Sequence, residues 1–278
     1  MNGLSIWGSF PRRRRRVLLF PCLLFLLLSA AVALAALLLP EAAGTNVIEK
    51  KGATVDASHS DQGYVMVKYK PTDKRLKLRI SLGKDTYTYD LNSQGEYEVF
   101  PLQLGSGSYK LQVFSQVSGN KYNTVSSLTV KAKLENEFLP YLYPSQYVNY
   151  DGNSQAVQKA AELCGGLTTD EEKFKTVYQY VVEHMVYDYV LALTVKSGYL
   201  PTVDQTLNSN KGICFDFATL MAVMLRSQGV PTQLVIGYAD QNYHAWNLVY
   251  YNNNWMRCDA TSDICGVTVA SYTTERFY

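Results

Sequence analysis

Two hydrophobic periods divide this chain. In residues 63–134, apolar and polar residues alternate in short runs, such as Leu76–Leu82 and Tyr109–Val113, and turn-forming residues separate the runs. From residue 151 onward, apolar residues first recur at helical spacing and then return to β-prone runs. The pattern therefore predicts an all-β domain followed by an α+β domain.

The alternating runs and the irregular segments between the domains set the predicted boundaries. About six or seven short strands in residues 63–134 are typical of a β-sandwich of immunoglobulin-like shape. Residues 45–62 are polar and irregular, which predicts a tether. Residues 135–150 carry two prolines and no clear period, which predicts a linker. Residues 151–278 then form the second domain.

A basic run and an apolar segment open the chain, within residues 1–44. Arg12–Arg16 is followed by the uncharged segment Val17–Leu39, and a helix of about 20 residues crosses a bilayer. We therefore expect a transmembrane anchor at residues 17–39, with its basic flank in the cytoplasm and the rest of the chain on the extracellular side. The alternative is a signal peptide cleaved near Ala33–Ala35, which would give a secreted protein.

The charge balance gives no reason to expect a nucleic-acid partner. The chain has 26 Lys and Arg residues and 24 Asp and Glu residues, and five of the basic residues are Arg12–Arg16. The rest of the chain is therefore close to neutral, without the basic patch that nucleic-acid binding requires.

Residues 211–263 carry the candidate chemistry. Apolar residues of helical period follow Cys214, and Gly229 and Pro231 mark the end of that helix. The helix therefore begins near the cysteine and places its thiol in the first turn. Free N–H groups and the helix dipole favour an anion at this position, and the thiolate is the nucleophilic form of cysteine.

An imidazole and a carboxylate follow on predicted strands. The β-prone runs Gln233–Tyr238 and Tyr243–Tyr251 are joined by a turn, and a third run ends near Asp259. His244 then begins one strand and Asp259 ends its antiparallel neighbour, so the two side chains meet at one end of the sheet. In this arrangement the carboxylate holds the imidazole tautomer, and the imidazole deprotonates the Cys214 thiol.

Each of these residues taken alone favours a structural role. A cysteine in a helix is usually a small buried hydrophobe, and a single histidine near a strand end is usually an ordinary structural residue. All three groups together, in this order and on these elements, favour catalysis.

Three motifs in this region resemble those of the transglutaminase-like superfamily, whose members share a papain-like core. The matching residues are Gly212, Cys214, Asp216, Phe217 and Ala218 around the nucleophile, Arg226, Gly229, Val230, Gly237 and Tyr238 after it, and His244, Ala245, Trp246, Trp255, Asp259 and Thr261 around the base and the acid. The resemblance covers the predicted second domain. It implies that Cys214, His244 and Asp259 form a catalytic triad that needs no metal and no organic cofactor. It does not fix the reaction, because members of the superfamily cross-link proteins, hydrolyse peptides or amides, or have lost activity.

The same resemblance extends to the aromatic residues at Val186–Tyr189, because similar positions precede the nucleophile in the superfamily. We expect the backbone N–H of Cys214 and one side-chain donor to hold the oxyanion of the reaction. The candidates for that donor are Tyr187 and Gln205.

Three further cysteines lie in the second domain. An exported domain permits disulfides, and Cys258 and Cys265 close a short loop beside Asp259. We expect these two to form a disulfide that fixes the loop. Cys164 is left as a candidate buried thiol, since connectivity cannot be read from sequence alone.

Two classes of function fit these observations. The first is a cell-surface or secreted acyl-transfer enzyme, either a peptidase or amidase or a transglutaminase-type cross-linking enzyme, acting on peptide or protein substrates that include cell-wall-associated ones. The second is a catalytically inactive transglutaminase-like module that binds or supports other molecules at the cell surface. The intact triad favours the enzyme. The short segment after Asp263 predicts that little chain is left to wall a deep pocket.

Overall fold

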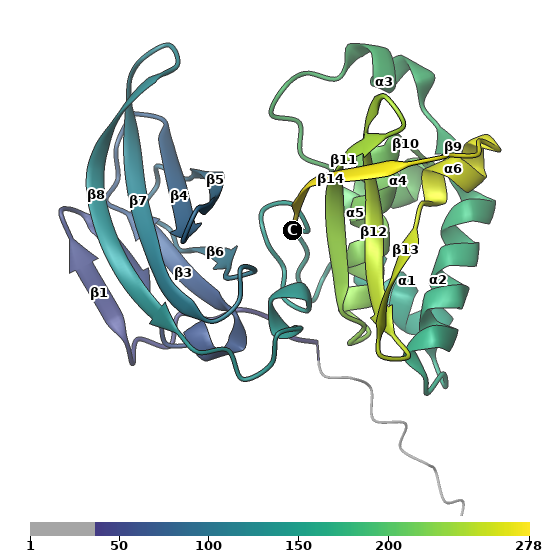
Figure 1. The fold of residues 1–278 in the computed structure, drawn as a ribbon, viewed down its shortest axis with the longest axis horizontal. Coiled ribbons are helices and arrows are strands. Elements are labelled where there is room, and N and C mark those ends of the chain that lie inside the picture. The colour runs from purple at the N-terminus through teal and green to yellow at the C-terminus, as the bar shows by residue number, and fades with distance from the viewer. Residues whose placement is uncertain (1–36) are drawn as a thin grey trace, which may run out of the picture. The chain divides into compact units, whose positions relative to one another are not determined.

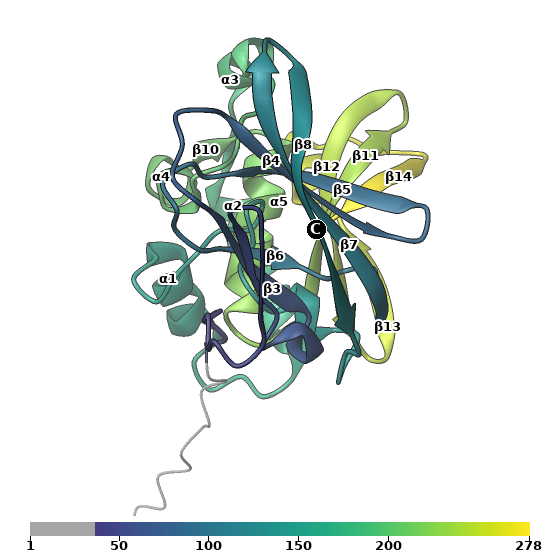
Figure 2. The same cartoon turned by 90° about the vertical axis from the view of Figure 1, so that its left-hand side faces the viewer.

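The alternating runs of the first domain form two antiparallel sheets of four strands in the computed structural model, which describes residues 37–278. The sheets have the orders β1-β2-β3-β6 and β5-β4-β7-β8. Their strands are β1 (Val47–Lys50), β2 (Ala53–Asp56), β3 (Tyr64–Tyr69), β4 (Leu76–Leu82), β5 (Asp85–Leu91), β6 (Glu98–Pro101), β7 (Gly107–Ser118) and β8 (Lys121–Ala132). The long β7–β8 hairpin lies alongside β4 (Figures 1 and 2). Apolar residues of both sheets, such as Val65, Leu78 and Leu111, are fully buried, as the period of two requires.

Residues 45–62 belong to this domain and are not the predicted tether. They form β1, β2 and a 3-10 helix, η1 (Ser60–Gln62). Between the two strands, Lys51 and Gly52 both have positive φ, +50° and +83°, as in the tight turns that favour hairpins. Ala53 and Val55 are 1% and 0% exposed. The four-residue strands are too short for their alternation to stand out from the polar residues around them.

Residues 135–150, the predicted linker, are packed. They contain a second 3-10 helix, η2 (Leu139–Tyr141). The tyrosine rings of this segment are buried, while their hydroxyl groups form hydrogen bonds. The Tyr150 hydroxyl, for example, donates to the Leu142 carbonyl at 2.8 Å. The buried residues of the segment include Tyr141, Tyr143, Val148 and Tyr150. This segment is therefore part of the hydrophobic core.

The second domain is built on one antiparallel sheet of the order β13-β12-β11-β14. Its strands are β11 (Thr232–Ala239), β12 (Asn242–Tyr251), β13 (Asn254–Cys258) and β14 (Tyr272–Phe277). The first three are the predicted strands, joined at the predicted turns. Strand β14 was not predicted, and it pairs with β11 on the side away from β12. A Cβ atom on Gly237 would lie 2.0 Å from the Thr273 carbonyl oxygen, so this close pairing requires glycine in β11.

Helices cover this sheet, with α5 packed against β11 and β12 (Figure 1). The helices are α1 (Gln155–Cys164), α2 (Asp170–His184), α3 (Tyr189–Thr194), α4 (Val203–Ser209), α5 (Cys214–Arg226) and α6 (Ala260–Cys265). Thr169 caps α2 in a capping box with Glu172. Helix α5 begins at Cys214, as predicted, and every residue from Asp216 to Arg226 is buried.

Aromatic side chains join the two domains, which belong to one compact unit. The ring of Tyr278 stacks on that of Tyr147, with 3.9 Å between centroids, and meets Tyr89 of β5 edge to face. Arg276 of β14 donates to the Thr86 carbonyl of β5 at 2.9 Å. Strand β5 is an edge strand of its sheet, so these contacts also cover an edge that would otherwise be open to pairing.

Within residues 37–278, no helix combines the length and the apolar character needed to cross a membrane. The predicted anchor at residues 17–39 lies outside the described residues except for Leu37–Leu39, which are not helical. The predicted cytoplasmic basic run and signal-peptide cleavage site also lie outside them.

Candidate active site

Cys214 is the first residue of the buried helix α5. Ile213 before it is extended, with φ −109°. Gly212 belongs to the short strand β10 (Lys211–Gly212), which pairs in parallel with β9 (Val186–Tyr187). The Cys214 side chain is half-buried and lines a cavity. The thiol therefore lies beside the unpaired N–H groups of a helix start, where a thiolate is stabilised.

Asp216 fixes the start of this helix. Its carboxylate accepts the Ile213 N–H at 2.8 Å and the Tyr199 hydroxyl. Burial raises the pKa of Asp216, against these two hydrogen bonds, which lower it. A Cβ atom on Gly212 would lie 2.6 Å from the Asp216 Cβ, so glycine is required two residues before the cysteine. The Gly212-Ile213-Cys214-Phe215-Asp216 motif thus has a physical basis in the shape of this turn.

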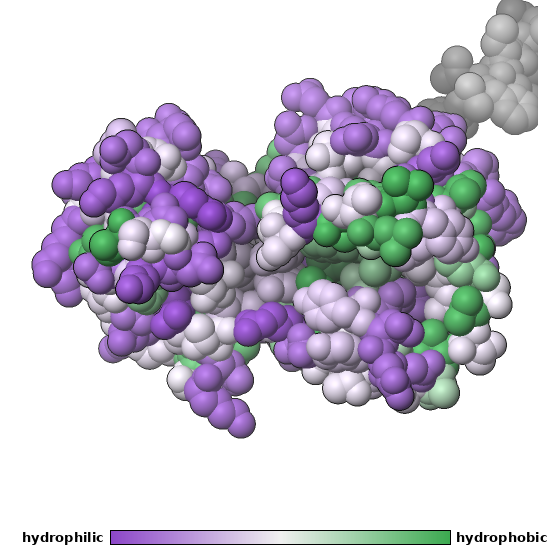
Figure 3. Space-filling view, turned by 90° about the horizontal axis from the view of Figure 1, so that it is seen from above, coloured by the Kyte–Doolittle hydropathy of each residue, from purple (hydrophilic) through white to green (hydrophobic). Residues whose placement is uncertain are grey.

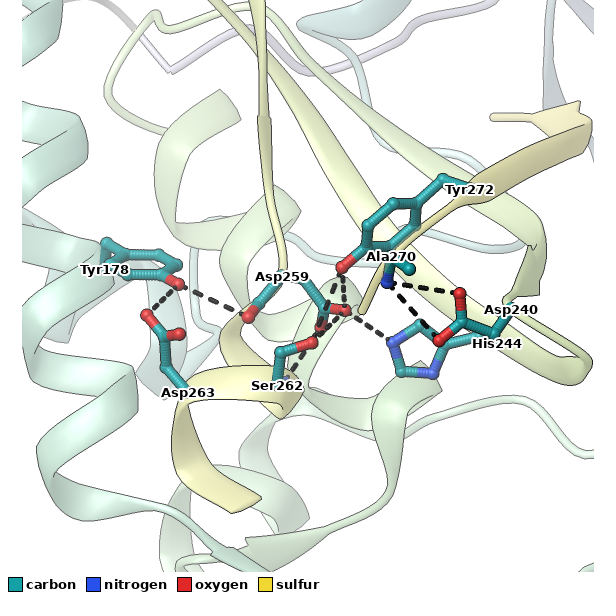
Figure 4. A network of polar contacts seen from close by, with 8 residues as sticks. All are labelled: Tyr178, Asp240, His244, Asp259, Ser262, Asp263, Ala270 and Tyr272. Atoms are coloured by element: carbon teal, nitrogen blue, oxygen red, sulfur yellow. Dashed lines mark hydrogen bonds and ion pairs between the residues drawn. The ribbon is translucent and has the colours of Figure 1, made fainter. Parts of the chain in front are cut away.

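His244 and Asp259 meet at one end of the sheet, as their predicted strands require. His244 lies in β12, and Asp259 directly follows β13, the strand paired with β12. The imidazole Nε2 lies 2.8 Å from Asp259 Oδ2 (Figure 4). Burial alone would lower the pKa of His244, but the hydrogen bond to Asp259 and the nearby Cys214 sulfur raise it to about 9. The imidazole is therefore protonated at neutral pH, and its Nδ1 is left for the thiol.

Asp259 is held as a carboxylate by several donors. It caps α6 by accepting the Ser262 N–H at 3.2 Å, and it accepts the Ser262 hydroxyl at 2.6 Å and the Tyr272 hydroxyl at 2.9 Å (Figure 4). Burial alone would raise the pKa of Asp259, but the hydrogen bonds from His244, Ser262 and Tyr272 lower it. The acid of the pair therefore stays charged next to the imidazolium.

Sequence reasoning missed Ser262 and Tyr272. Ser262 has a local signal, because aspartate is a favoured helix N-cap that accepts the backbone N–H two or three residues later, and Ser262 lies three residues after Asp259. Tyr272 has none, since it reaches the site only through the pairing of β14 with β11. The turn residue Asp240 anchors the loop before β14 by accepting the N–H group of Ala270 at 3.1 Å (Figure 4) and that of Ser271 at 2.9 Å.

The two candidate oxyanion donors are placed differently. Tyr187 lines the cavity together with Cys214, and its strand β9 pairs directly with Gly212. Burial and the neighbouring cysteines raise the pKa of Tyr187 to about 12, so its hydroxyl keeps its proton. Gln205 lies on the exposed side of α4 and outside the cavity lining. The structure therefore does not bring Gln205 to the site, because α4 turns it to the solvent.

A cavity of about 730 Å³ surrounds the cysteine and histidine. Its walls come from both domains, with Thr88 and Asp90 of β5 facing the site from the first domain. Arg276 and Tyr278, at and after β14, also line it. The prediction that the segment after Asp263 leaves little chain to wall a pocket is therefore wrong, because this segment forms a strand beside the site and the first domain supplies another wall.

The predicted disulfide between Cys258 and Cys265 is absent, and both residues are free thiols. The chain between them forms α6, and six helical residues span about 9 Å. This separation carries Cys265 away from Cys258, which is buried at the end of β13. Burial raises the pKa of the buried thiol Cys164.

Within the described part of the chain, no group of three or more His, Cys, Asp and Glu residues is arranged to hold a metal ion. The site presents a thiol (Cys214), an imidazole (His244) and a carboxylate (Asp259), with N–H and hydroxyl donors around them.

The candidate site lies in a part of the chain that matches a known protein family. Residues 157–260 match the transglutaminase-like superfamily. Kyphoscoliosis peptidase of Homo sapiens is 28% identical over 133 residues, which cover 43% of this chain and only 19% of the human protein.

Two solved structures are also similar to this chain. A candidate cysteine protease from Cytophaga hutchinsonii is 16% identical, with a TM-score of 0.44 over 78% of this chain and 79% of that chain. The periplasmic domain of TgpA from Pseudomonas aeruginosa is 15% identical, with a TM-score of 0.38 over 79% of this chain and 96% of that chain.

Proposed function

We propose that this chain, which carries a transglutaminase-like domain at residues 157–260, is a cysteine-dependent acyl-transfer enzyme acting on peptide or protein amides. The observation that carries the proposal is the hydrogen bond of 2.8 Å between His244 and Asp259, in the cavity that also holds Cys214. A thiol at a helix start beside an imidazolium is the arrangement that activates cysteine nucleophiles.

In the first half of the reaction, the Cys214 thiolate attacks the carbonyl carbon of the amide. The oxyanion that forms is held by the backbone N–H of Cys214 and the hydroxyl of Tyr187. His244 then donates the Nδ1 proton to the amide nitrogen, the C–N bond breaks, and the amine leaves an acyl-thioester on Cys214. Asp259 stabilises the imidazolium and keeps its ring oriented.

In the second half, an acceptor attacks the thioester carbonyl and gives its proton to His244. The C–S bond breaks and the thiolate returns. Water as the acceptor gives a peptidase or amidase, and a lysine amine gives a cross-link. A fluorescent primary amine added with a test protein distinguishes the two, because only the second reaction incorporates the label into protein.

The first experiment is the rate of Cys214 alkylation by iodoacetamide against pH, in the full-length chain and in His244→Ala. We expect fast labelling at pH 5–6 that the substitution abolishes, because the imidazolium stabilises the thiolate. Labelling that rises only near pH 8.5, the ordinary thiol value, and that ignores His244 would instead support the inactive binding module. Cys214→Ala identifies the labelled site.

The role of Tyr187 has its own test. Tyr187→Phe removes one hydroxyl donor, and loss of one oxyanion donor lowers kcat about 100-fold or more. Unchanged turnover of an amide substrate, with unchanged alkylation of Cys214, would remove Tyr187 from the mechanism.

We further propose that the enzyme works outside the cytoplasm, on substrates that include cell-wall-associated peptides. Arg12–Arg16 followed by the uncharged segment Val17–Leu39 supports an exported chain. Labelling of Cys214 on intact cells by a membrane-impermeant maleimide tests the location. Labelling that requires cell lysis would place the domain inside.

A further inference from the structure

Helix α3 is an apolar helix without a buried residue. Its six residues are Tyr-Val-Leu-Ala-Leu-Thr, yet none of them is buried. Tyr189, Val190 and Leu193 are 68%, 73% and 88% exposed. A surface helix normally turns its apolar residues toward the core, so α3 presents an apolar face that no residue of the described chain covers.

Residues next to this face line the cavity that holds Cys214, although Tyr189, Val190 and Leu193 themselves lie outside its lining. Ala192 of α3 and the following residues Val195 and Leu200 form an apolar wall of that cavity. Seen from the side on which α3 lies, apolar surface gathers beside a hollow of the molecule (Figure 3). A chain whose carbonyl group reaches Cys214 can therefore contact this wall.

Polar bonds hold both ends of this apolar wall to the segment that carries the nucleophile. Before α3, the Asp188 N–H donates to the Gly212 carbonyl at 2.8 Å, and the Asp188 carboxylate caps the helix by accepting the Leu191 N–H at 2.9 Å. After α3, the Tyr199 hydroxyl donates to Asp216 in the first turn of α5. The wall is therefore held in a fixed position relative to Cys214 before any ligand binds. This reduces the conformational entropy that the protein loses on binding.

The charges around the cavity indicate what kind of chain fits. Lys196 is the one charged residue between Tyr189 and Leu200, and Arg276 lines the same cavity. The carboxylate of Asp90 lies 2.7 Å from Lys77 and 3.4 Å from Arg75, so its charge is already compensated. The cavity therefore favours an apolar segment that is neutral or acidic over a basic one.

We propose that α3 and residues 195–200 form a subsite for a large apolar side chain of the polypeptide substrate, next to the bond that Cys214 attacks. This inference rests on the proposed function, since it assigns a specificity to the same reaction. The helix contributes binding and orientation and takes no part in the proton transfers.

The test compares two irreversible probes of Cys214, the acyloxymethyl ketones of acetyl-Leu-Leu-Gly and acetyl-Gly-Gly-Gly, with iodoacetamide as a probe that needs no subsite. Attack by the thiolate forms the S–C bond and releases the carboxylate of the probe. In the full-length chain we expect the leucine probe to react at least about tenfold faster than the glycine probe, as for other apolar subsites. In the double variant Val195→Ser, Leu200→Ser, which changes two residues that line the cavity, this ratio should fall toward one, with the iodoacetamide rate unchanged.

Control variants separate the subsite from general effects. Val117→Ser removes an apolar residue that is 60% exposed in β7, outside the cavity lining, and should leave all three rates unchanged. Leu200→Met keeps an apolar side chain in the lining and should keep the ratio.

A ratio near one in the wild type, or a ratio that the double variant does not change, would overturn the subsite. A dimer in light scattering that the double variant dissociates would reassign α3 and residues 195–200 to self-association. Slow iodoacetamide labelling of the wild type at pH 5–6 would count against the proposed function instead.

Discussion

Opposite pKa shifts at His244 and Asp259 set the protonation state of the site at the residue scale. The pKa of His244 is raised to about 9 and that of Asp259 is lowered, so both are charged across the neutral range. An imidazolium next to a thiol stabilises the thiolate, and the carboxylate keeps the imidazolium from losing its proton. The pair is thus prepared to donate a proton before substrate arrives.

This coupling predicts how stability changes with pH. The folded pKa of His244, about 9, lies above the ordinary histidine value of 6.5. Its contribution to the free energy of unfolding is therefore fully present below pH 6.5 and is lost as the pH rises toward 9. Urea unfolding at pH 6, 7, 8 and 9 measures this decline.

His244→Ala is the matched control, because it should flatten the dependence over this range. An equal decline in both proteins would show that other groups cause it. His184→Ala provides a second control, since that imidazole lies at the end of α2 and its Nδ1 donates to the Tyr180 carbonyl at 2.9 Å.

Individual site residues differ in how visible they are in the sequence. Cys214, His244 and Asp259 lie on a helix and strands that the hydrophobic periods predict. That the three side chains come together therefore follows from one helix start and two hairpins. Tyr187 was found through the resemblance alone. Gln205 was placed by its distance from the cysteine along the chain, and nothing in the sequence told which face of α4 it occupies.

At the element scale, helices and strands with long hydrophobic patterns could be predicted from the sequence, and the short elements could not. The fully apolar helix α5 and the strands β11–β13 carry long, regular patterns. Strands β1 and β2 have four residues each, and β9 and β10 have two, which is too few for a period to appear. Strand β14 forms because β11 offers a free edge and a glycine, and neither feature is local to residues 272–277.

Strand β14 carries a testable contribution to the site. Tyr272→Phe removes the hydroxyl that donates to Asp259 at 2.9 Å. Because that bond lowers the pKa of Asp259, its loss should move the acid limb of Cys214 reactivity to higher pH. A hydrogen bond to a charged group contributes about 1.5–3 kcal/mol, so the acid limb should move up by about one to two pH units.

The control for this change is Tyr238→Phe, which alters a half-exposed ring of β11 outside the Asp259 network. Alkylation rates measured across pH 4–9 compare the variants. An unchanged acid limb in Tyr272→Phe would show that Tyr272 only supports the loop.

At the scale of the whole molecule, one buried arginine joins distant segments. Arg226 at the end of α5 donates to the carbonyl oxygens of Thr232 at the start of β11, Tyr143 in the packed segment and Tyr278 after β14, at 2.9, 2.9 and 2.7 Å. Burial lowers the pKa of Arg226 to about 10, so it remains charged at neutral pH. Its planar group of donors binds three carbonyls at once, and that of Tyr278 also accepts the Leu234 N–H at 2.8 Å.

Arg226→Lys tests this role. A single ammonium group on a shorter donor set cannot reach all three carbonyls, and each buried group left unpaired costs about 1–3 kcal/mol. We expect the free energy of unfolding to fall by about 2–5 kcal/mol in urea titrations. Arg75→Lys, an exposed change on the first domain, should have almost no effect, and equal effects of the two would refute the role.

The sequence also predicted two domains and their order, but not the contact between them. The apolar and aromatic residues at that contact, such as Tyr89 and Tyr278, serve equally well in a strand of an isolated domain. Only the folded chain shows that β5 faces β14, and that the wall opposite Cys214 belongs to the first domain. The cavity was for this reason beyond prediction.

The position of β14 has a consequence for biosynthesis. During translation Cys214, His244 and Asp259 all leave the ribosome before Tyr272, Arg276 and Tyr278, which complete the acid's hydrogen bonds and one wall of the cavity. A nascent chain that already contains its nucleophile therefore lacks the finished site. Maturation of reactivity is thus delayed until the sheet closes, which protects the thiol and its neighbours while the polypeptide is still being made.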